Sequence, residues 1–206
     1  MKLFYYLLRA KVKLSSFIMQ WIYQMDFKFK LNALGVRYGN NVKCLNGFLE
    51  LEVSRHAKKV WFDDSVIFNS VNTAWYSNCK VTVGENAELT MGKHSGMNGA
   101  LIFCMNRITI GNHVDIGGGT RIYDTNFHSI DYRYRRDFDI DRQHVITAPV
   151  TIGDDVFIGT GCIIGKGITI GDRSVIAAGS VVVKDIPADC IAGGNPCKVI
   201  KMMNNE

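Results

Sequence analysis

A repeat of six residues organises the hydrophobic positions in the second half of the chain. An aliphatic residue returns every six positions from Ile110, and after a gap the series resumes in the same phase at Ile152. A second series of small or β-branched residues lies four positions after the first. The first series is Ile110, Ile116, Ile122, Ile152, Ile158, Ile164, Ile170, Ile176 and Val182, and the second is Val114, Thr120, Val156, Cys162, Ile168, Ser174 and Ser180. Six is neither a helical period nor a simple alternation, and it suits a short flat strand followed by a sharp corner.

Glycine follows the aliphatic residue in most of these hexads, as in Ile110-Gly111 and Ile152-Gly153. It is required where the backbone is crowded or adopts an unusual φ. The aliphatic side chain points into a narrow core, where β-branched shapes pack well. Three strand-and-corner units close one triangular turn of about eighteen residues, and several turns must stack because one buries too little apolar surface. The pattern predicts an all-β solenoid, a parallel β-helix that is clearest from Ile110 to Val183.

The repeat is less regular on both sides of this region. Upstream, Tyr38-Gly39, Val83-Gly84 and Met91-Gly92 have the composition of partial corners, and residues 60–83 are rich in β-forming residues without regular spacing. Downstream, Pro187 ends the last strand, because proline cannot donate to a central ladder. We therefore expect the β-helix to occupy residues 33–190 and a C-terminal tail to occupy residues 191–206.

A polar, aromatic and charged segment, residues 123–149, interrupts the repeat. Loops of this length inside a compact domain are usually functional or disordered. Because the hexad phase resumes a whole number of repeats later, we expect this segment to be extruded from an otherwise continuous coil.

The first 32 residues combine Leu, Phe, Tyr and Ile with scattered cations, which predicts an amphipathic helical segment. No apolar run reaches the roughly 18 to 20 residues of a membrane span, and no small-residue cleavage site of a signal peptide follows. Two placements remain open. The helix packs on the body or on a neighbouring subunit, or residues 1–30 lie on an anionic membrane face.

Composition excludes several classes of function. The net charge of +5 is mild, and the chain has neither a basic stripe with aromatic residues nor a nucleic-acid docking motif. None of the six cysteines has CxxC spacing, so we expect reduced, mostly buried thiols in a cytoplasmic protein, whether free or at the inner face of the membrane.

Three features together resemble a known family: the Ile-Gly hexads, the loop with a histidine, and the terminal stretch KDIPADCIAGGNPCKVIK. Over residues 84–201 the chain is similar to the hexapeptide-repeat acyltransferases, most of all to the galactoside, maltose and polysaccharide O-acetyltransferases. Residues 1–35 do not match the N-terminal segment of the galactoside and maltose enzymes. The resemblance implies a left-handed β-helix and a homotrimer, with acetyl-CoA and the acceptor bound in clefts between neighbouring coils.

The resemblance also assigns catalytic residues. His128 occupies the place of the family's catalytic histidine, shortly after the coil breaks, and an imidazole is suited to removing a hydroxyl proton near neutral pH. Asp124 or Asp131 would orient its ring, and the sequence does not choose between them. Asn98 corresponds to an asparagine that contacts the acceptor or the reaction centre, with a stacked corner asparagine as the alternative.

The same resemblance assigns residues to the donor. Thr160 would offer its backbone N–H to the thioester region and stabilise an oxyanion, and Phe157 replaces a tryptophan that forms a wall of the cleft. Ala178 and Lys184 match positions along the pantetheine arm and the nucleotide. Lys198 and Lys201 match basic residues that reach the phosphates, although lysine lacks the bidentate fork of arginine.

These residues predict an acetyl-CoA-dependent O-acetyltransferase that acts on a hydroxyl of a sugar or glycan. The alternatives are an N-acetyltransferase for an amino sugar or amino acid, and a non-catalytic β-helix scaffold. We expect neither a cysteine nucleophile nor a metal site. The related γ-type carbonic anhydrases use zinc-binding histidines at i and i+5, and no histidine pair here has that spacing.

Overall fold

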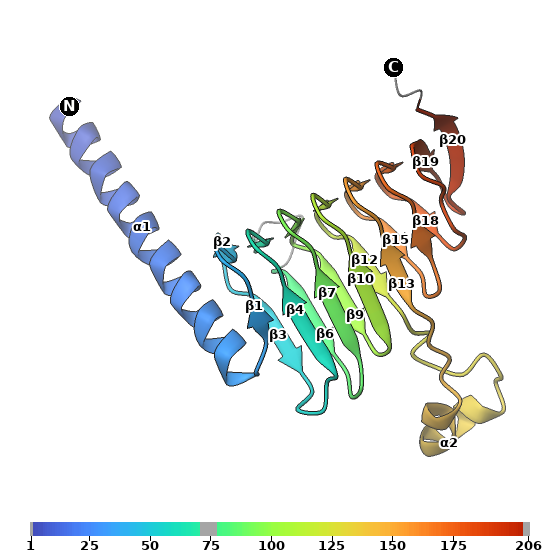
Figure 1. Ribbon diagram of the computed structural model, residues 1–206. Coiled ribbons are helices and arrows are strands. Elements are labelled where there is room, and N and C mark those ends of the chain that lie inside the picture. The colour runs from blue at the N-terminus through green and yellow to red at the C-terminus, as the bar shows by residue number, and fades with distance from the viewer. Residues whose placement is uncertain (1, 71–77, 204–206) are drawn as a thin grey trace.

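The body of the protein is a parallel β-helix of three sheets (Figure 1). The computed structural model describes residues 2–70 and 78–203, and for residues 2–14 only the course of the backbone. The first sheet contains β1 (Arg37–Tyr38), β4 (Lys59–Phe62), β7 (Glu88–Met91), β10 (Arg107–Ile110), β13 (Val150–Ile152) and β16 (Thr169–Ile170). The second contains β2 (Lys43–Leu45), β5 (Ile67–Asn69), β8 (Gly96–Asn98), β11 (Asp115–Ile116), β14 (Phe157–Ile158), β17 (Val175–Ile176), β19 (Cys190–Gly193) and β20 (Lys198–Met202). The third contains β3 (Glu50–Val53), β6 (Lys80–Val83), β9 (Leu101–Cys104), β12 (Arg121–Tyr123), β15 (Ile163–Ile164) and β18 (Val181–Val182).

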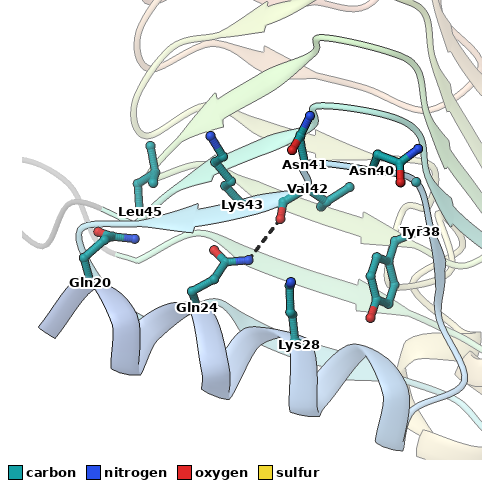
Figure 2. Close-up of a pocket in the computed structure, with 10 residues that line it drawn as sticks. Gln20, Gln24, Lys28, Tyr38, Asn40, Asn41, Val42, Lys43 and Leu45 are labelled. Atoms are coloured by element: carbon teal, nitrogen blue, oxygen red, sulfur yellow. Dashed lines mark hydrogen bonds between the residues drawn. The ribbon is translucent and has the colours of Figure 1, made fainter. Parts of the chain in front are cut away.

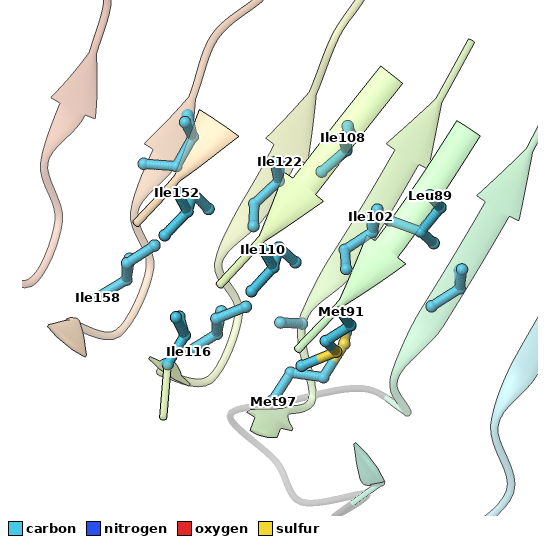
Figure 3. Packing of buried hydrophobic residues seen from close by; sticks show 14 of the residues in the cluster. Leu89, Met91, Met97, Ile102, Ile108, Ile110, Ile116, Ile122, Ile152 and Ile158 are labelled. Atoms are coloured by element: carbon cyan, nitrogen blue, oxygen red, sulfur yellow. The ribbon is translucent and has the colours of Figure 1, made fainter. Parts of the chain in front are cut away.

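The register of the sheets explains the six-residue period. Each sixth residue lies on the next face of the prism, so residues one coil apart stack in a column. Ile110 pairs with Ile152 and then Ile170, and the corresponding columns on the other two faces begin at Ile116 and Ile122. All of these side chains are buried (Figure 3). Full burial of one such side chain is worth about 1.5–3 kcal/mol, so the stacked columns supply most of the apolar burial.

The glycine after the aliphatic residue is required by crowding rather than by its φ. A Cβ added at Gly111 would lie 2.7 Å from the carbonyl carbon of Gly153 in the next coil, and Gly153 in turn faces the backbone of Asp172. Neither glycine has a positive φ. Adjacent coils approach too closely at this corner for any side chain.

Coils of unequal length hide the six-residue period upstream: Phe62 and Met91, which stack, are 29 positions apart, and Met91 and Ile110 are 19 apart, against 18 in the regular coils. Phe68 stacks on Met97 and Met97 on Ile116 in one column, while Phe62, Met91 and Ile110 stack in another. Strands β2 to β10 have three or four residues, against two in most of the later coils. The irregular upstream repeat is therefore confirmed: these coils keep the parallel pairing across insertions, and their columns contain bulkier residues.

Helix α1 (Lys2–Ala33) covers the open end of the first coil (Figure 1). Phe27 and Leu31 are fully buried against that coil. The Gln24 side chain donates to the Val42 carbonyl and accepts from the Cys44 N–H, both at 3.0 Å. Figure 2 shows the bond from Gln24 to the Val42 carbonyl. Gln20 repeats the pattern one helical turn earlier, with the Cys44 carbonyl and the Asn46 N–H. Two side-chain amides thus pair with the backbone of β2 as a neighbouring strand would.

The predicted fold, a left-handed parallel β-helix with an N-terminal helix and an extruded loop, is confirmed. The six cysteines are free and buried, and burial raises the pKa of the Cys44 thiol to about 11. No helix in the described ranges has the length and apolar character needed to cross a membrane.

Candidate active site

The extruded loop leaves the coil after β12, returns at β13 and projects away from the prism (Figure 1). Its base is fastened by Asp124, which is fully buried. The two oxygens of this carboxylate accept the backbone N–H groups of Met105 and Asn106, each at 2.7 Å. The Asp124 carbonyl also accepts the N–H of Ala148 on the returning strand. Asp124 therefore joins both ends of the loop to the preceding coil and does not orient His128.

His128 is held by a carboxylate that the sequence did not indicate. Its Nδ1 atom lies 2.6 Å from Oδ2 of Asp141, and Oδ1 of Asp141 accepts the N–H of Ser129 at 2.7 Å. The hydrogen bonds from His128 and from the Ser129 N–H hold the pKa of Asp141 below its usual value. An ionised carboxylate only accepts hydrogen bonds, so Nδ1 carries the proton and Nε2 keeps a free lone pair.

The two acids considered from the sequence have other partners. Asp124 fastens the loop, and Asp131 pairs with the Arg133 side chain and accepts its backbone N–H at 2.9 Å. These bonds lower the pKa of Asp131 to about 2. A short helix, α2 (Phe138–Gln143), brings Asp141 to His128 instead. Its N-cap Asp137, whose side chain accepts the N–H groups of Asp139 and Ile140, was the one sequence signal for this helix.

The loop backbone beside His128 is anchored on both sides. Phe127 packs against Phe103 and Tyr123, with ring centroids 4.8 and 5.1 Å apart. On the other side, the Arg135 guanidinium donates to the carbonyls of Ser129 and Ile130 at 2.6 and 2.7 Å. The His128 side chain is nevertheless 68% exposed. The ring is fixed in orientation and still open to a second molecule.

Asn98 ends β8 and belongs to a ladder of asparagines. Asn46 donates to Asn69 at 2.8 Å, and Asn69 donates to the side-chain oxygen of Asn98 at 2.7 Å. Beside it lies a shallow cleft of about 180 Å³ that Asn69 and Asp115 also line. Asn98 is thus both a stacked corner asparagine and an exposed one. No hydrogen bond among the described residues joins it to His128.

Thr160 and Ala178 occupy the same corner in successive coils. The carbonyl of Thr160 accepts the N–H of Gly179 at 2.8 Å, which stacks the two corners. The backbone N–H of Thr160 meets no acceptor within residues 2–70 and 78–203. Phe157 lies just before this corner with half of its side chain exposed. The exposed Phe157 ring and the unbonded Thr160 N–H therefore belong to the same strand and corner of the prism.

The three candidate lysines lie toward the C-terminal end and are all exposed. Lys198 and Lys201 belong to β20, which pairs antiparallel with β19 and so extends the second sheet beyond β17. Phe157 belongs to the same sheet. Lys184 follows β18 of the third sheet, so the structure groups Phe157 with Lys198 and Lys201 and sets Lys184 on another face.

Residues 149–184 match the family model described as the hexapeptide repeat of succinyl-transferase. The matched segment covers the coils from β13 to β18, where the columns of isoleucine and valine are most regular. The C-terminal coils of the chain therefore contain the hexapeptide repeat.

The relatives of this hexapeptide-repeat protein include O- and N-acetyltransferases. The galactoside O-acetyltransferase of Escherichia coli K12 is 40% identical over 99 residues, which are 48% of this chain and 46% of that enzyme. A 2,3,4,5-tetrahydropyridine-2,6-dicarboxylate N-acetyltransferase of Staphylococcus aureus is 46% identical over 54 residues, 26% of this chain and 23% of that enzyme. The chain therefore spans less than half of the length of these curated relatives.

A solved structure is also similar to this hexapeptide-repeat protein. It is a hexapeptide-repeat acetyltransferase of Vibrio cholerae complexed with acetyl-CoA, and it matches at 39% identity with a TM-score of 0.52. The match covers 57% of this chain and 61% of that chain. Among the described residues of our chain, no three His, Cys, Asp or Glu side chains gather where they would hold a metal ion.

Proposed function

We propose that this protein transfers an acetyl group from acetyl-CoA to a hydroxyl group of a sugar or glycan, with His128 as the general base. One observation carries the proposal: a buried carboxylate, Asp141, holds Nδ1 of an exposed histidine at 2.6 Å. That arrangement leaves Nε2 unprotonated and directed away from its anchor, as a base that serves a bound acceptor requires.

The proton and the acyl group move in one balanced sequence. Nε2 of His128 takes the hydroxyl proton while the hydroxyl oxygen attacks the thioester carbonyl. The tetrahedral intermediate then collapses, the carbon–sulfur bond breaks, and the sulfur of coenzyme A leaves with the proton held on Nε2. Asp141 stays ionised throughout and stabilises the imidazolium that forms between the two steps.

The oxyanion of the intermediate needs a hydrogen-bond donor that has no other acceptor. The Thr160 N–H meets this requirement, since no described residue accepts it. Removal of one preorganised donor of this kind lowers a rate by about 10²–10³-fold in other enzymes. Asn98, at the end of β8 and beside a cleft, is proposed to contact the acceptor.

The donor is proposed to lie along the C-terminal coils. Phe157 and Ala178 would line the pantetheine arm, and Lys184, Lys198 and Lys201 would meet the nucleotide and phosphates as point charges. The Vibrio cholerae relative, which was solved with acetyl-CoA, supports this donor. Because acetyl-CoA is a donor of the cytoplasm, we place the protein there.

A homotrimer completes the proposed site. His128 stands on the extruded loop while Thr160 and Asn98 lie on the prism, and no hydrogen bond among the described residues connects the loop histidine to either. The loop also exposes large apolar side chains, among them Ile130 and Phe138. A neighbouring subunit that covers these side chains would bring the base of one chain to the donor of the next.

The decisive experiment measures coenzyme A release from acetyl-CoA with galactosides, maltose and oligosaccharides as acceptors. His128→Ala is expected to lower kcat by about 10²–10⁴-fold, because a general base is lost. His56→Ala serves as the matched control, since it removes an exposed histidine that lies outside the extruded loop. Turnover by His128→Ala within a few fold of wild type would reject the proposal.

Transfer to an amine is the second candidate, because 54 residues of the chain are also similar to an N-acetyltransferase. Assays with amino sugars and amino acids beside the hydroxyl acceptors distinguish the two. A scaffold without activity is distinguished by thermal unfolding, since coenzyme A at a hundred times its Kd would stabilise an enzyme by about 2.7 kcal/mol.

A further inference from the structure

The outer face of helix α1 is a stripe of large apolar side chains that the β-helix does not cover. The inner face is used by Gln20, Gln24, Phe27 and Leu31, which bond to or pack against the first coil. On the outer face Phe17 is 71% exposed, Trp21 60% and Phe29 73%. The outer stripe, hereafter the apolar stripe, consists of Phe17, Ile18, Trp21, Ile22, Met25 and Phe29. The contacts of the inner face fix the rotation of the helix about its axis. The apolar stripe therefore cannot turn toward the core of the β-helix.

The charge of the protein is concentrated on this same helix. Residues 2–33 contain six Lys or Arg and one Asp, whereas the whole chain contains 24 Lys or Arg and 19 Asp or Glu. The rest of the chain therefore has 18 of each, and the entire formal excess of +5 belongs to α1. The single acid, Asp26, is already paired with Lys30 at 2.7 Å.

We infer that α1 docks the protein on an anionic membrane surface, with the apolar stripe inserted at the interface. An interfacial helix combines a continuous apolar stripe with basic residues, and it lacks the continuous hydrophobicity of a membrane span. Helix α1 has all three properties. Trp21 at the middle of the stripe suits the headgroup region, since its ring is apolar and its N–H needs a polar partner.

Electrostatics favours a membrane over a second copy of the chain as the occupant. Two copies of α1 placed face to face would bring together two helices of net charge +5 each. An anionic lipid surface instead attracts every one of these cations, and each Lys or Arg near such a surface adds to the affinity. The docking is independent of the proposed acetyl transfer, because no residue of the stripe lies among the candidate site residues.

Sedimentation of the full chain with vesicles tests the inference. Vesicles of phosphatidylcholine with phosphatidylglycerol are expected to bind the protein, and those of phosphatidylcholine alone to bind it at least about tenfold more weakly. High salt should reduce binding to the anionic vesicles, because it screens the attraction. Brominated lipids are expected to quench Trp21, and a Trp21→Phe variant should bind while losing that quenching.

A double variant with a matched control separates the stripe from general hydrophobicity. Phe17→Ser with Trp21→Ser removes two exposed aromatics and should weaken vesicle binding by about tenfold or more. Val183→Ser removes an apolar side chain that is 53% exposed on the prism, and it should leave vesicle binding unchanged. Far-UV circular dichroism verifies that each variant is folded. The inference would be overturned if the wild type failed to bind anionic vesicles or if the double variant bound them equally well. It would also be overturned if the only effect of the double variant were a smaller molecular mass in solution.

Discussion

The Nδ1 atom of His128 lies 2.6 Å from Oδ2 of Asp141, thirteen residues further along the chain. The same carboxylate accepts the N–H of Ser129, so one buried group fixes both the imidazole and the backbone beside it. Asp141→Asn is expected to lower kcat by about 10-fold to 10²-fold, because an amide can donate to Nδ1 and favour the wrong tautomer of His128. The KM for acetyl-CoA should change little. Steady-state kinetics at fixed pH check this, and an unchanged kcat would contradict the role given to Asp141.

Acid should loosen the extruded loop before it unfolds the coils. The pKa of Asp141 is lowered by its hydrogen bonds from His128 and Ser129, and that of Asp131 is lowered to about 2 by Arg133. For a carboxylate whose pKa is lowered in the folded state, the stabilisation is present above the unfolded value of about 3.9 and is lost as the pH falls through the folded value. The loop should therefore be fully ordered above about pH 5 and loosen toward pH 2.

Hydrogen exchange provides the measurement. The N–H groups of Ser129 and Arg133 are bonded to these carboxylates. Their protection factors, corrected for the intrinsic rate, should fall as the pH drops from 6 to 2, while that of Gly153 in the coil should hold longer. Equal loss at all three amides would mean that the loop and the coils respond to acid as one unit.

Replacement of a corner glycine should destabilise the β-helix in proportion to how closely the next coil approaches. Gly111→Ala places a methyl group 2.7 Å from the backbone of Gly153, and overpacking of this kind costs about 1–3 kcal/mol. Gly165→Ala is the control, because the added methyl group would lie 3.3 Å from its nearest neighbour, the carbonyl oxygen of Val182. Urea denaturation should show the larger loss of unfolding free energy for Gly111→Ala.

Removal of the Asp124 side chain should destabilise the loop base. Two backbone N–H groups, of Met105 and Asn106, would lose their acceptor in a buried place. Each unsatisfied donor costs about 1–3 kcal/mol, so Asp124→Ala should lower the free energy of unfolding by about 2–6 kcal/mol. Asp154→Ala is a milder control, because this exposed corner acid accepts the Asn112 N–H within reach of water. Equal losses in the two variants would contradict the anchoring role.

Two exposed lysines of β20 should affect only the binding of acetyl-CoA. Lys198→Ala and Lys201→Ala are each expected to raise the KM for acetyl-CoA by about 3- to 10-fold with kcat nearly unchanged, since a solvated charge pair contributes roughly 1 kcal/mol. Lys59→Ala on β4 is the control, because it lies on the first sheet, away from the proposed donor cleft. A fall in kcat without a change in KM would place these lysines in another role.

The repeat was predictable because each core position is dictated by one local rule. Ile152, Ile158 and Ile164 recur in phase since each must fill the same prism one face further on. Phe68 and Met97 stack in the same way, but the 29 positions between them break the six-residue spacing, so a search for that period does not find them. The need for glycine was also predictable, although only the structure shows that crowding is its cause at Gly111.

The partner of His128 was not predictable for a physical reason. Asp124 and Asp131 are closer to it in sequence, but backbone N–H groups and Arg133 satisfy them. Asp141 reaches the ring through a six-residue helix too short to leave a hydrophobic period. Tertiary contacts of the loop, and not local pattern, select the acid.

The two ends of the second sheet are covered in different ways. At one end the amides of Gln20 and Gln24 occupy the donors and acceptors of β2, and at the other β20 runs antiparallel against β19. An unprotected parallel edge would accept an identical coil from another molecule and permit unlimited growth. In the second sheet, neither end of the prism therefore offers a free parallel edge to an identical coil, which disfavours end-to-end growth of filaments.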